Sequence, residues 1–409
     1  MLEFLRARKR IIGIMAPMLL GLILMLICMA NLRQPVSFDE SRMAFMTRSD
    51  FSAAYELSGE DANPPLYVFA LKTWSHFFGH TDFAMRMLSV LLGAVAVMVT
   101  YVWLRREHSL AAAIIGAGLL SVSPALVWSG QEMQLFAMLV TVSIIATYIL
   151  QIAICRGDYW WIIYAVSLAL IFWASYVGLV VWILHAIYLF IKYRHTINKR
   201  YVTFSFIAAF ALTLPGLGDF FRAIIRSESY GSWVLAIVIL CASFLTIIAG
   251  IAVAKLFSRR RIFAFCALVV LIIISFCGIS SVSAKKDQLA NKQLFESITV
   301  FDHESHLPIV CANPRLYMDL SFYASSKHPV YYDDENAEYN QRLYILRDTR
   351  IGRFEAAGIE TFWYVTTMDQ ETGEPSTQYP NGDWSVAEYS LIHLDNFSET
   401  YAIVKMVKE

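Results

Sequence analysis

Long apolar runs dominate the first 284 residues and predict a bundle of membrane-spanning helices. The first run extends from Ile11 to Leu32, and about 20 apolar residues suffice for a helix to cross a bilayer. Eight further runs follow, at 83–103, 109–127, 132–154, 159–175, 177–191, 201–217, 233–257 and 262–283. The pattern therefore predicts nine spans.

The basic residues between these runs predict the orientation. A basic cluster at 6–10 precedes the first run, and the alternate loops at 105–106, 156, 192–200 and 255–261 are also basic. Positively charged loops stay on the cytoplasmic side. We therefore expect a multi-pass protein of the cell membrane with a cytoplasmic N-terminus and an extracytoplasmic C-terminal part.

The segment 33–82 is expected to form an outer loop with one helix at 41–57 and a second, interfacial helix at 64–79. The second helix would reach only about 24 Å, which is too short for a span. Its apolar and polar residues recur at helical spacing on two opposite faces: Leu66, Phe69, Ala70, Trp74, Phe77 and Phe78 on one, and Lys72, Ser75, His76 and Gly79 on the other. This pattern is typical of an amphipathic helix lying in the membrane interface.

The last part of the chain has a different character. From Lys285 to Glu409 there are 11 basic and 20 acidic residues, although the whole chain has no net charge. Short β-like runs at 307–311, 329–332, 361–365 and 401–405 alternate with helical stretches at 314–326 and 337–357. We therefore expect a membrane domain at 1–284 and a small extracytoplasmic α/β domain at 285–409.

Composition excludes several classes of protein. With 57% hydrophobic and 16% charged residues and a mean hydropathy of +0.53, the chain is not a soluble globular protein. Its basic residues lie in short loops rather than along one face, so no nucleic-acid partner is expected. The six cysteines include no Cys-x-x-Cys spacing of the kind that binds zinc.

The first candidate for chemistry is the carboxylate pair Asp39 and Glu40 in the outer loop. In one interpretation, Ser37 and Glu40 form a capping box at a helix start, which leaves Asp39 without a structural task. In the other, the pair is the working end of an enzyme that uses membrane-borne substrates. Two adjacent carboxylates could also hold a divalent metal, and no other cofactor is predicted.

Further polar residues occur at the same outer face. Asn63 precedes a double proline and Tyr67 at the start of the interfacial helix, and the pair Gln131-Glu132 lies at an outer end of the third run. A glutamate at that depth needs a polar partner or a cavity. Lys72 and Arg86 are candidate cations for such a cavity. Prolines that merely start a helix, and basic side chains that snorkel to the interface, remain the structural alternatives.

The order of these motifs resembles the family 39-type membrane glycosyltransferases of the GT-C class. The residues that carry the resemblance, over about 1–190, are Phe38-Asp-Glu40, Asn63-Pro-Pro-Leu-Tyr67, Phe83-Ala-Met-Arg86-Met-Leu-Ser89, Ser123-Pro124 and Trp128-Ser-Gly-Gln-Glu132. The family includes protein O-mannosyltransferases and lipid A aminoarabinose transferases. The resemblance implies a polytopic α-helical GT-C-like fold and an extracytoplasmic transferase.

By this resemblance the donor is a sugar on a polyprenyl phosphate whose lipid part stays in the membrane, and the acceptor is a glycan, lipid or protein. Asp39 matches the family's general base, which deprotonates the acceptor. Arg86 and Lys72 would offset the donor phosphate. Glu40 and Glu132 would orient these groups or the acceptor, and Asn63, Tyr67, Gln131 and Gln134 would complete the binding site.

Three positions depart from the family pattern. Asn63 stands where the family usually has His, and Gln134 and Phe136 replace an Arg and a Tyr. After the fifth run, Ala174-Ser175-Tyr176 stands where the family commonly has Thr-His-Tyr. These changes leave open a different donor or a lost activity. Two rival hypotheses are therefore a non-catalytic scaffold in envelope glycan assembly and a transporter. Transporters carry polar, broken segments near mid-membrane, whereas these carboxylates lie at one face.

Overall fold

A computed structural model describes residues 2–408 except 31, 33, 35, 61–62, 194–196, 226–229, 283–288, 303–305, 325–327, 334–353, 355–358, 369–383 and 394–399. The chain forms two compact units. The first comprises residues 1–33 and 54–284, and the second comprises residues 34–53 and 285–409. The predicted helix at 337–357 lies outside the described residues, apart from Phe354.

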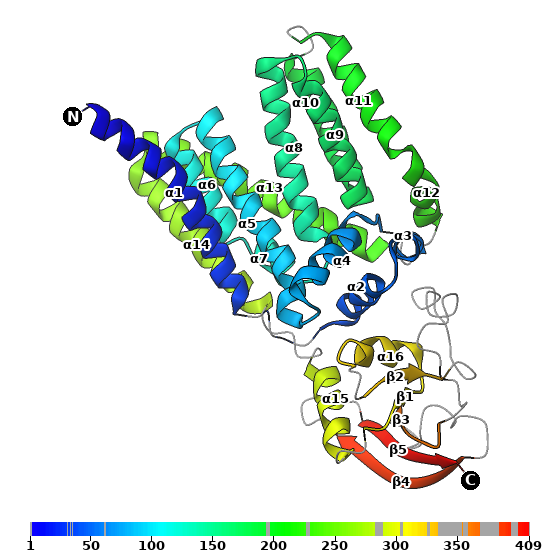
Figure 1. Ribbon diagram of the computed structural model, residues 1–409. Helices are drawn as coiled ribbons and strands as arrows, with labels where there is room; N and C mark the ends of the chain where they lie inside the picture. The colour runs from blue at the N-terminus through cyan, green and yellow to red at the C-terminus, as the bar shows by residue number, and fades with distance from the viewer. Residues whose placement is uncertain are drawn as a thin grey trace. The chain divides into compact units, whose positions relative to one another are not determined.

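The first unit is helical (Figure 1). Its α-helices are α1 (Leu2–Met29), α4 (Leu66–Phe78), α5 (Asp82–Glu107), α6 (Leu110–Ser121), α7 (Pro124–Gln131), α8 (Phe136–Arg156), α9 (Trp160–Ala174), α10 (Leu179–Tyr193), α11 (Lys199–Thr213), α12 (Leu217–Ile225), α13 (Tyr230–Arg259) and α14 (Arg261–Val282). Helix α3 (Phe51–Glu60) crosses the boundary between the units. The expected helix at 41–57 is thus two helices, because the chain turns at 49–50 and the Asp50 carboxylate accepts the Ala53 N–H at 2.8 Å.

Each of the nine apolar runs coincides with one of these helices or with a consecutive pair. Six described helices are long and apolar enough to cross a membrane, and α6 with α7 makes a seventh if this bent pair is one span. The 50° bend comes immediately before Pro124, whose ring and missing N–H prevent a continuous helix. The apolar stretches 13–29 and 160–174 are shorter, so the number nine stays a prediction.

Helix packing in the first unit uses small residues at close crossings. Helix α6 packs against α5 and α13, and α5 also packs against α1, α7 and α8. At the α6–α13 crossing Gly116 faces Gly250, and a side chain on Gly250 would collide with the Gly116 backbone. Small residues at such points let apolar helices approach closely. Figure 1 shows α8 to α11 side by side in the same unit.

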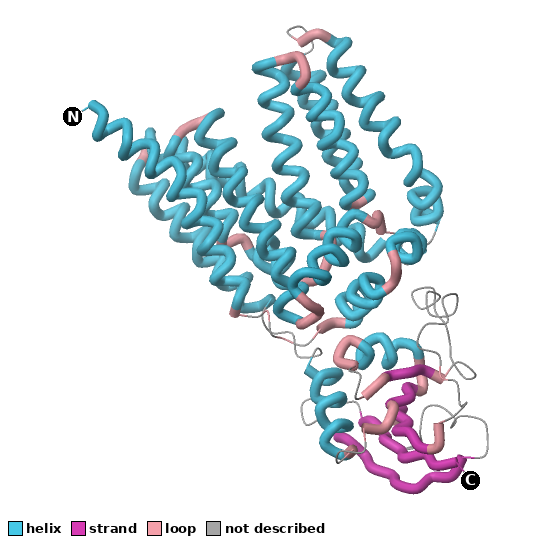
Figure 2. The backbone as a smooth tube through the Cα atoms, viewed as in Figure 1, coloured by secondary structure: helices cyan, strands magenta, loops and turns pink. Residues whose placement is uncertain are grey.

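The second unit holds every described strand (Figure 2). Its elements are α2 (Phe38–Arg48), α15 (Leu289–Phe301), β1 (Ile309–Cys311), α16 (Pro314–Ser321), β2 (Val330–Tyr332), β3 (Thr361–Thr367), β4 (Trp384–His393) and β5 (Thr400–Lys408). The sheet order is β2-β1-β3-β5-β4, in which β1 pairs in parallel with β2 and β3, and β5 pairs antiparallel with β3 and β4.

The central strands β1, β3 and β5 are buried on both faces, and one hydrophobic cluster lies on one face of the sheet. This cluster contains the buried side chains Val310, Ala312, Phe362, Tyr364, Val404 and Met406, with Phe354 and Trp384 packed against them. All four predicted strands are present, and β4 is an additional strand. Residues 34–53 pack with this unit, whereas the sequence predicts them to be part of the membrane domain. Their contact with α16 is the reason.

Candidate functional site

The two carboxylates of the outer loop have different environments at the start of α2. Glu40 is fully buried, and its carboxylate accepts the Ser37 backbone N–H at 2.9 Å. This is the reach-back contact of a capping box. The Asp39 side chain is 45% exposed, with Arg42 at 3.3 Å. The structural interpretation therefore accounts for Glu40, while Asp39 keeps an accessible carboxylate beside a buried guanidinium.

Helix α2 is held in the second unit by contacts with α16 and the chain beyond it. Phe45 packs edge-on against Tyr317, and the Arg315 guanidinium lies over the Phe38 ring. Arg48 donates to the carbonyls of Ser321 at 2.9 Å and Phe322 at 3.3 Å. A cation at the C-terminal end of a helix also interacts favourably with the helix dipole. The C-terminal residues therefore fix the helix that carries Asp39.

A second group of predicted residues comes together in the first unit, where α1, α5 and α7 meet. The Tyr67 hydroxyl is 2.8 Å from the Ser89 hydroxyl. Arg86 is 2% exposed and donates to the Leu32 carbonyl at 3.0 Å. The Gln131 amide reaches the Cys28 carbonyl at 3.5 Å. Arg86 is thus buried inside the helix bundle, and the alternative of a snorkelling arginine is wrong for this residue.

The remaining predicted residues lie on the same unit. Glu132 is buried and Gln134 half-buried in the turn between α7 and α8. Asn63 is half-buried, and its N–H donates to the Ser58 carbonyl at 3.1 Å. Lys72 is half-buried on α4. The structure therefore places Asn63, Tyr67, Lys72, Arg86, Gln131, Glu132 and Gln134 in one unit and Asp39 and Glu40 in the other.

Helix α4 packs one side against the protein and leaves Phe77 and Phe78 of its predicted apolar face exposed, whereas Ser75 of its predicted polar face is buried. Its protein-facing side is formed by Tyr67, Val68, Leu71 and Ser75, which are buried. The predicted apolar face surrounds a shallow surface hollow of about 390 Å³, lined by Leu66, Phe69, Ala70, Thr73, Trp74 and Phe77. Phe77 and Phe78 are exposed. An outward apolar face on such a helix suits a membrane interface.

One cluster in the first unit was missed by the sequence analysis. The Tyr55 hydroxyl donates to the Asp219 carboxylate at 3.0 Å, and Arg222 forms an ion pair with the same carboxylate. Burial and the hydrogen bond to Asp219 raise the pKa of Tyr55. Gly59 leaves room for the carboxylate, since a methyl group there would approach Asp219 to 3.3 Å. The sequence carries one signal for this cluster. Asp219 and Arg222 are three residues apart, the spacing of an ion pair on one helix face, and they follow Pro215-Gly216 at the end of an apolar run.

A larger cavity of about 610 Å³ lies at the other end of α5, near Glu107. It is lined mainly by apolar side chains of α8, α10 and α13, with His185 and Lys192 among its polar groups. His185 bridges the hydroxyls of Thr147 at 3.1 Å and Tyr164 at 3.0 Å. Polar groups inside an apolar bundle usually have such partners, and these hydrogen bonds account for the histidine as part of the helix packing.

Comparisons with known proteins agree with this architecture. The family model "Dolichyl-phosphate-mannose-protein mannosyltransferase" matches residues 62–218. ArnT from Cupriavidus metallidurans in the apo state is 11% identical, with a TM-score of 0.51 over 93% of this chain and 96% of that chain. The same protein bound to undecaprenyl phosphate is 12% identical, with a TM-score of 0.48 over 94% and 96%.

Archaeal oligosaccharyltransferase AglB from Archaeoglobus fulgidus, in complex with an inhibitory peptide and a dolichol-phosphate, is 12% identical with a TM-score of 0.40, over 73% of this chain and 40% of that one. No curated protein matches the sequence. The fold likeness rests on apo ArnT, the one of the three with a TM-score above 0.5. With the family match it confirms the predicted resemblance to GT-C membrane glycosyltransferases and the predicted fold class.

Proposed function

We propose that this chain is a membrane glycosyltransferase that moves a sugar from a polyprenyl phosphate to an extracytoplasmic acceptor. The observation that carries the proposal is the family match over residues 62–218, because its description names a sugar carried on a dolichyl phosphate. The matched region includes every predicted binding residue from Asn63 to Gln134. The nearly full-length likeness to apo ArnT supports the same scaffold.

Asp39 is the proposed general base. Its half-exposed carboxylate can receive a proton from an acceptor hydroxyl or amine, whereas buried Glu40 already accepts the Ser37 N–H. As the proton moves to Asp39, the acceptor atom bonds to the anomeric carbon and the bond from that carbon to the phosphate oxygen breaks. The electron pair leaves with the polyprenyl phosphate. General-base assistance of this kind contributes about 10²- to 10⁴-fold in rate.

The residues of the first unit are proposed to hold the donor. Negative charge on the phosphate grows as the glycosidic bond breaks, and preorganised cations stabilise that charge. Arg86 and Lys72 are the cations assigned to this role. The Arg86 guanidinium is buried in the first unit and donates to the Leu32 carbonyl, so its charge is fixed in position. Tyr67, Asn63, Gln131, Glu132 and Gln134 supply polar groups that would orient the sugar or the acceptor.

The apolar face of α4 fits a donor with a lipid tail. A helix that turns Phe69, Trp74 and Phe77 outward can rest at the membrane surface. In the proposed orientation the N-terminus is cytoplasmic, and α4 and the second unit are extracytoplasmic. A polyprenyl phosphate would then present its sugar at the outer surface while its tail stays in the bilayer.

A transfer assay separates this proposal from its rivals. Purified full-length protein in lipid nanodiscs is incubated with a series of polyprenyl-phosphate sugars and cell-envelope acceptors, and release of polyprenyl phosphate is measured. A glycosyltransferase releases it in step with acceptor glycosylation. A scaffold releases none, and a transporter instead moves the intact sugar lipid between leaflets in proteoliposomes; either of those results would overturn the proposal.

A further inference from the structure

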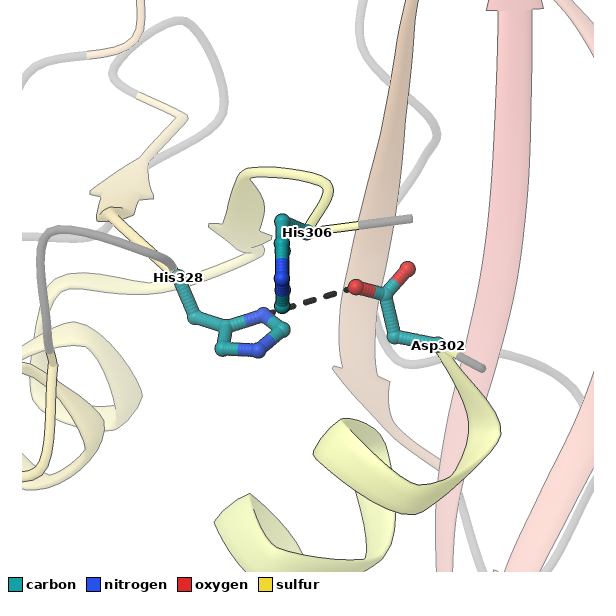
Figure 3. A group of neighbouring side chains, drawn as sticks. All are labelled: Asp302, His306 and His328. Atoms are coloured by element: carbon teal, nitrogen blue, oxygen red, sulfur yellow. Dashed lines mark ion pairs between the residues drawn. The ribbon is translucent and has the colours of Figure 1, made fainter. Parts of the chain in front are cut away.

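Three side chains of types that bind metal ions converge in the second unit (Figure 3). Asp302 follows the last residue of α15, His306 precedes β1, and His328 precedes β2. One ligand atom from each lies within 4.8 Å of the other two. The His328 Nδ1 is 3.5 Å from the Asp302 Oδ2, and the two imidazole rings are 5.2 Å apart at 78°.

The Asp302 carboxylate is buried and held in a fixed orientation. It is 2% exposed. Its Oδ1 accepts the Trp363 indole N–H at 2.9 Å, and its Oδ2 accepts the Leu307 backbone N–H at 3.0 Å. Such outer hydrogen bonds are typical of a carboxylate that binds a metal ion. Burial of a charged carboxylate is costly unless hydrogen bonds, an ion pair or a metal ion compensate for the lost water. This carboxylate also lies at the C-terminal end of α15, where the helix dipole disfavours negative charge. The position therefore favours a cation.

The chemistry of the three groups favours a transition-metal ion such as zinc over calcium or magnesium. Two imidazoles and one carboxylate form a zinc ligand set, whereas calcium and magnesium take oxygen ligands. Tetrahedral zinc with bonds of about 2.0–2.2 Å keeps its ligand atoms roughly 3.3 Å apart. The Asp302–His328 separation is already close to this value. His306 is exposed and can close the remaining distance by rotating its side chain.

We propose that Asp302, His306 and His328 bind one zinc ion, with a water molecule as the fourth ligand. The ion would tie the end of α15 to the residues that lead into β1 and β2. Both strands are only three residues long, so their hydrogen-bond ladders alone fix these segments weakly. The site would therefore stabilise the unit that also carries α2. This inference does not depend on the proposed transferase activity.

The test measures zinc binding to untagged full-length protein in detergent, after metal has been removed with a chelator. Zinc is titrated in competition with a chromophoric chelator, and zinc-edge X-ray absorption then reports the ligands. We expect one zinc per chain, nitrogen and oxygen ligands at about 2.0–2.2 Å and no sulfur. Excess magnesium or calcium should leave the zinc affinity unchanged.

Two variants with a matched control assign the site. His306→Ala removes an exposed ligand and should weaken zinc binding by more than about 100-fold, beyond the usual effect of an outer hydrogen-bond partner. Trp363→Phe should keep one zinc per chain and weaken it by about 10- to 100-fold. His76→Ala, which changes an exposed histidine of α4, should have no effect.

Gel filtration and circular dichroism confirm that each variant is folded. Absence of saturable zinc binding to the wild type would reduce the cluster to an aspartate–histidine ion pair and overturn the proposal. Unchanged zinc affinity in folded His306→Ala would overturn it as well, because the ion would then bind elsewhere.

Discussion

Glu40 should act as a structural residue, so its replacement by Gln and by Ala should give different results. Its carboxylate is fully buried and accepts the Ser37 N–H at 2.9 Å. Glu40→Gln keeps an acceptor of nearly the same shape, and Gln is also found at this position of capping boxes. Glu40→Ala removes the acceptor and leaves the Ser37 N–H to find another.

The expected magnitudes follow from these contacts. Loss of a buried hydrogen-bond partner costs about 1–3 kcal/mol, and loss of a cap costs about 0.5–2 kcal/mol. Both figures describe the loss of the same helix cap, so they are not added. We expect Glu40→Ala to cost about 2 kcal/mol, which is roughly a 30-fold increase in the opening of α2. Glu40→Gln keeps an acceptor and loses a favourable charge at a helix N-terminus, which contributes about 0.3–1 kcal/mol. This corresponds to roughly a 2- to 5-fold increase in the opening of α2.

Hydrogen exchange followed by mass spectrometry on the full-length protein measures this opening in peptides from α2, and the transfer assay is run on the same samples. Glu56→Gln, at an exposed position of α3, is the matched control. We expect Glu40→Gln to retain most of its turnover. If it instead lost about 100-fold or more in turnover while exchange in α2 matched the wild type, Glu40 would have a chemical role and the structural assignment would be refuted.

Three further predictions test the topology and the donor site. In a background without native cysteines, a cysteine at Asp50 should react with an impermeant thiol reagent in intact cells and one at Asn198 should not; labelling at Asn198 would refute the proposed orientation. Lys72→Ala should weaken binding of a polyprenyl-phosphate donor more than Trp74→Phe, because only the former removes a charge, and equal affinities would make Lys72 a snorkelling side chain. Arg86→Gln should lower thermal stability as well as donor affinity, because a hydrogen bond from a buried charged group contributes about 1.5–3 kcal/mol; an unchanged melting temperature would contradict its packing role.

Local patterns in the sequence were sufficient to predict most of the elements. Apolar runs located the membrane helices, and alternation of short apolar runs located β1, β2, β3 and β5. Strand β4 was missed because its residues 384–393 mix polar and apolar side chains and many of them are exposed at the edge of the sheet. The break at 49–50 lies in the polar stretch from Thr47 to Asp50. Ser and Asp are common at helix starts, and this signal was not used in the prediction of one helix at 41–57.

The long-range parts of the site were beyond such patterns. The sequence placed Asp39 in a loop of the membrane domain, but contacts such as Phe45 with Tyr317 attach its helix to residues more than 270 positions away. His306 precedes β1 and His328 precedes β2, and the parallel pairing of these strands brings the two preceding segments together. Asp302 lies four residues before His306. An aspartate and a histidine four residues apart gave a weak local signal, and the second histidine gave none.

The turnover of Asp39→Asn tests the central claim most directly. Asn keeps the shape of the side chain and removes the proton acceptor, so sugar transfer at saturating donor should fall by about 10²- to 10⁴-fold while donor binding and exchange in α2 stay as in the wild type. Asp50→Asn is the matched control, because Asn caps a helix as well as Asp does and the Asp50 carboxylate caps α3; its turnover should be unchanged. If folded Asp39→Asn transferred sugar at the wild-type rate, Asp39 would not be the general base and the account would be contradicted.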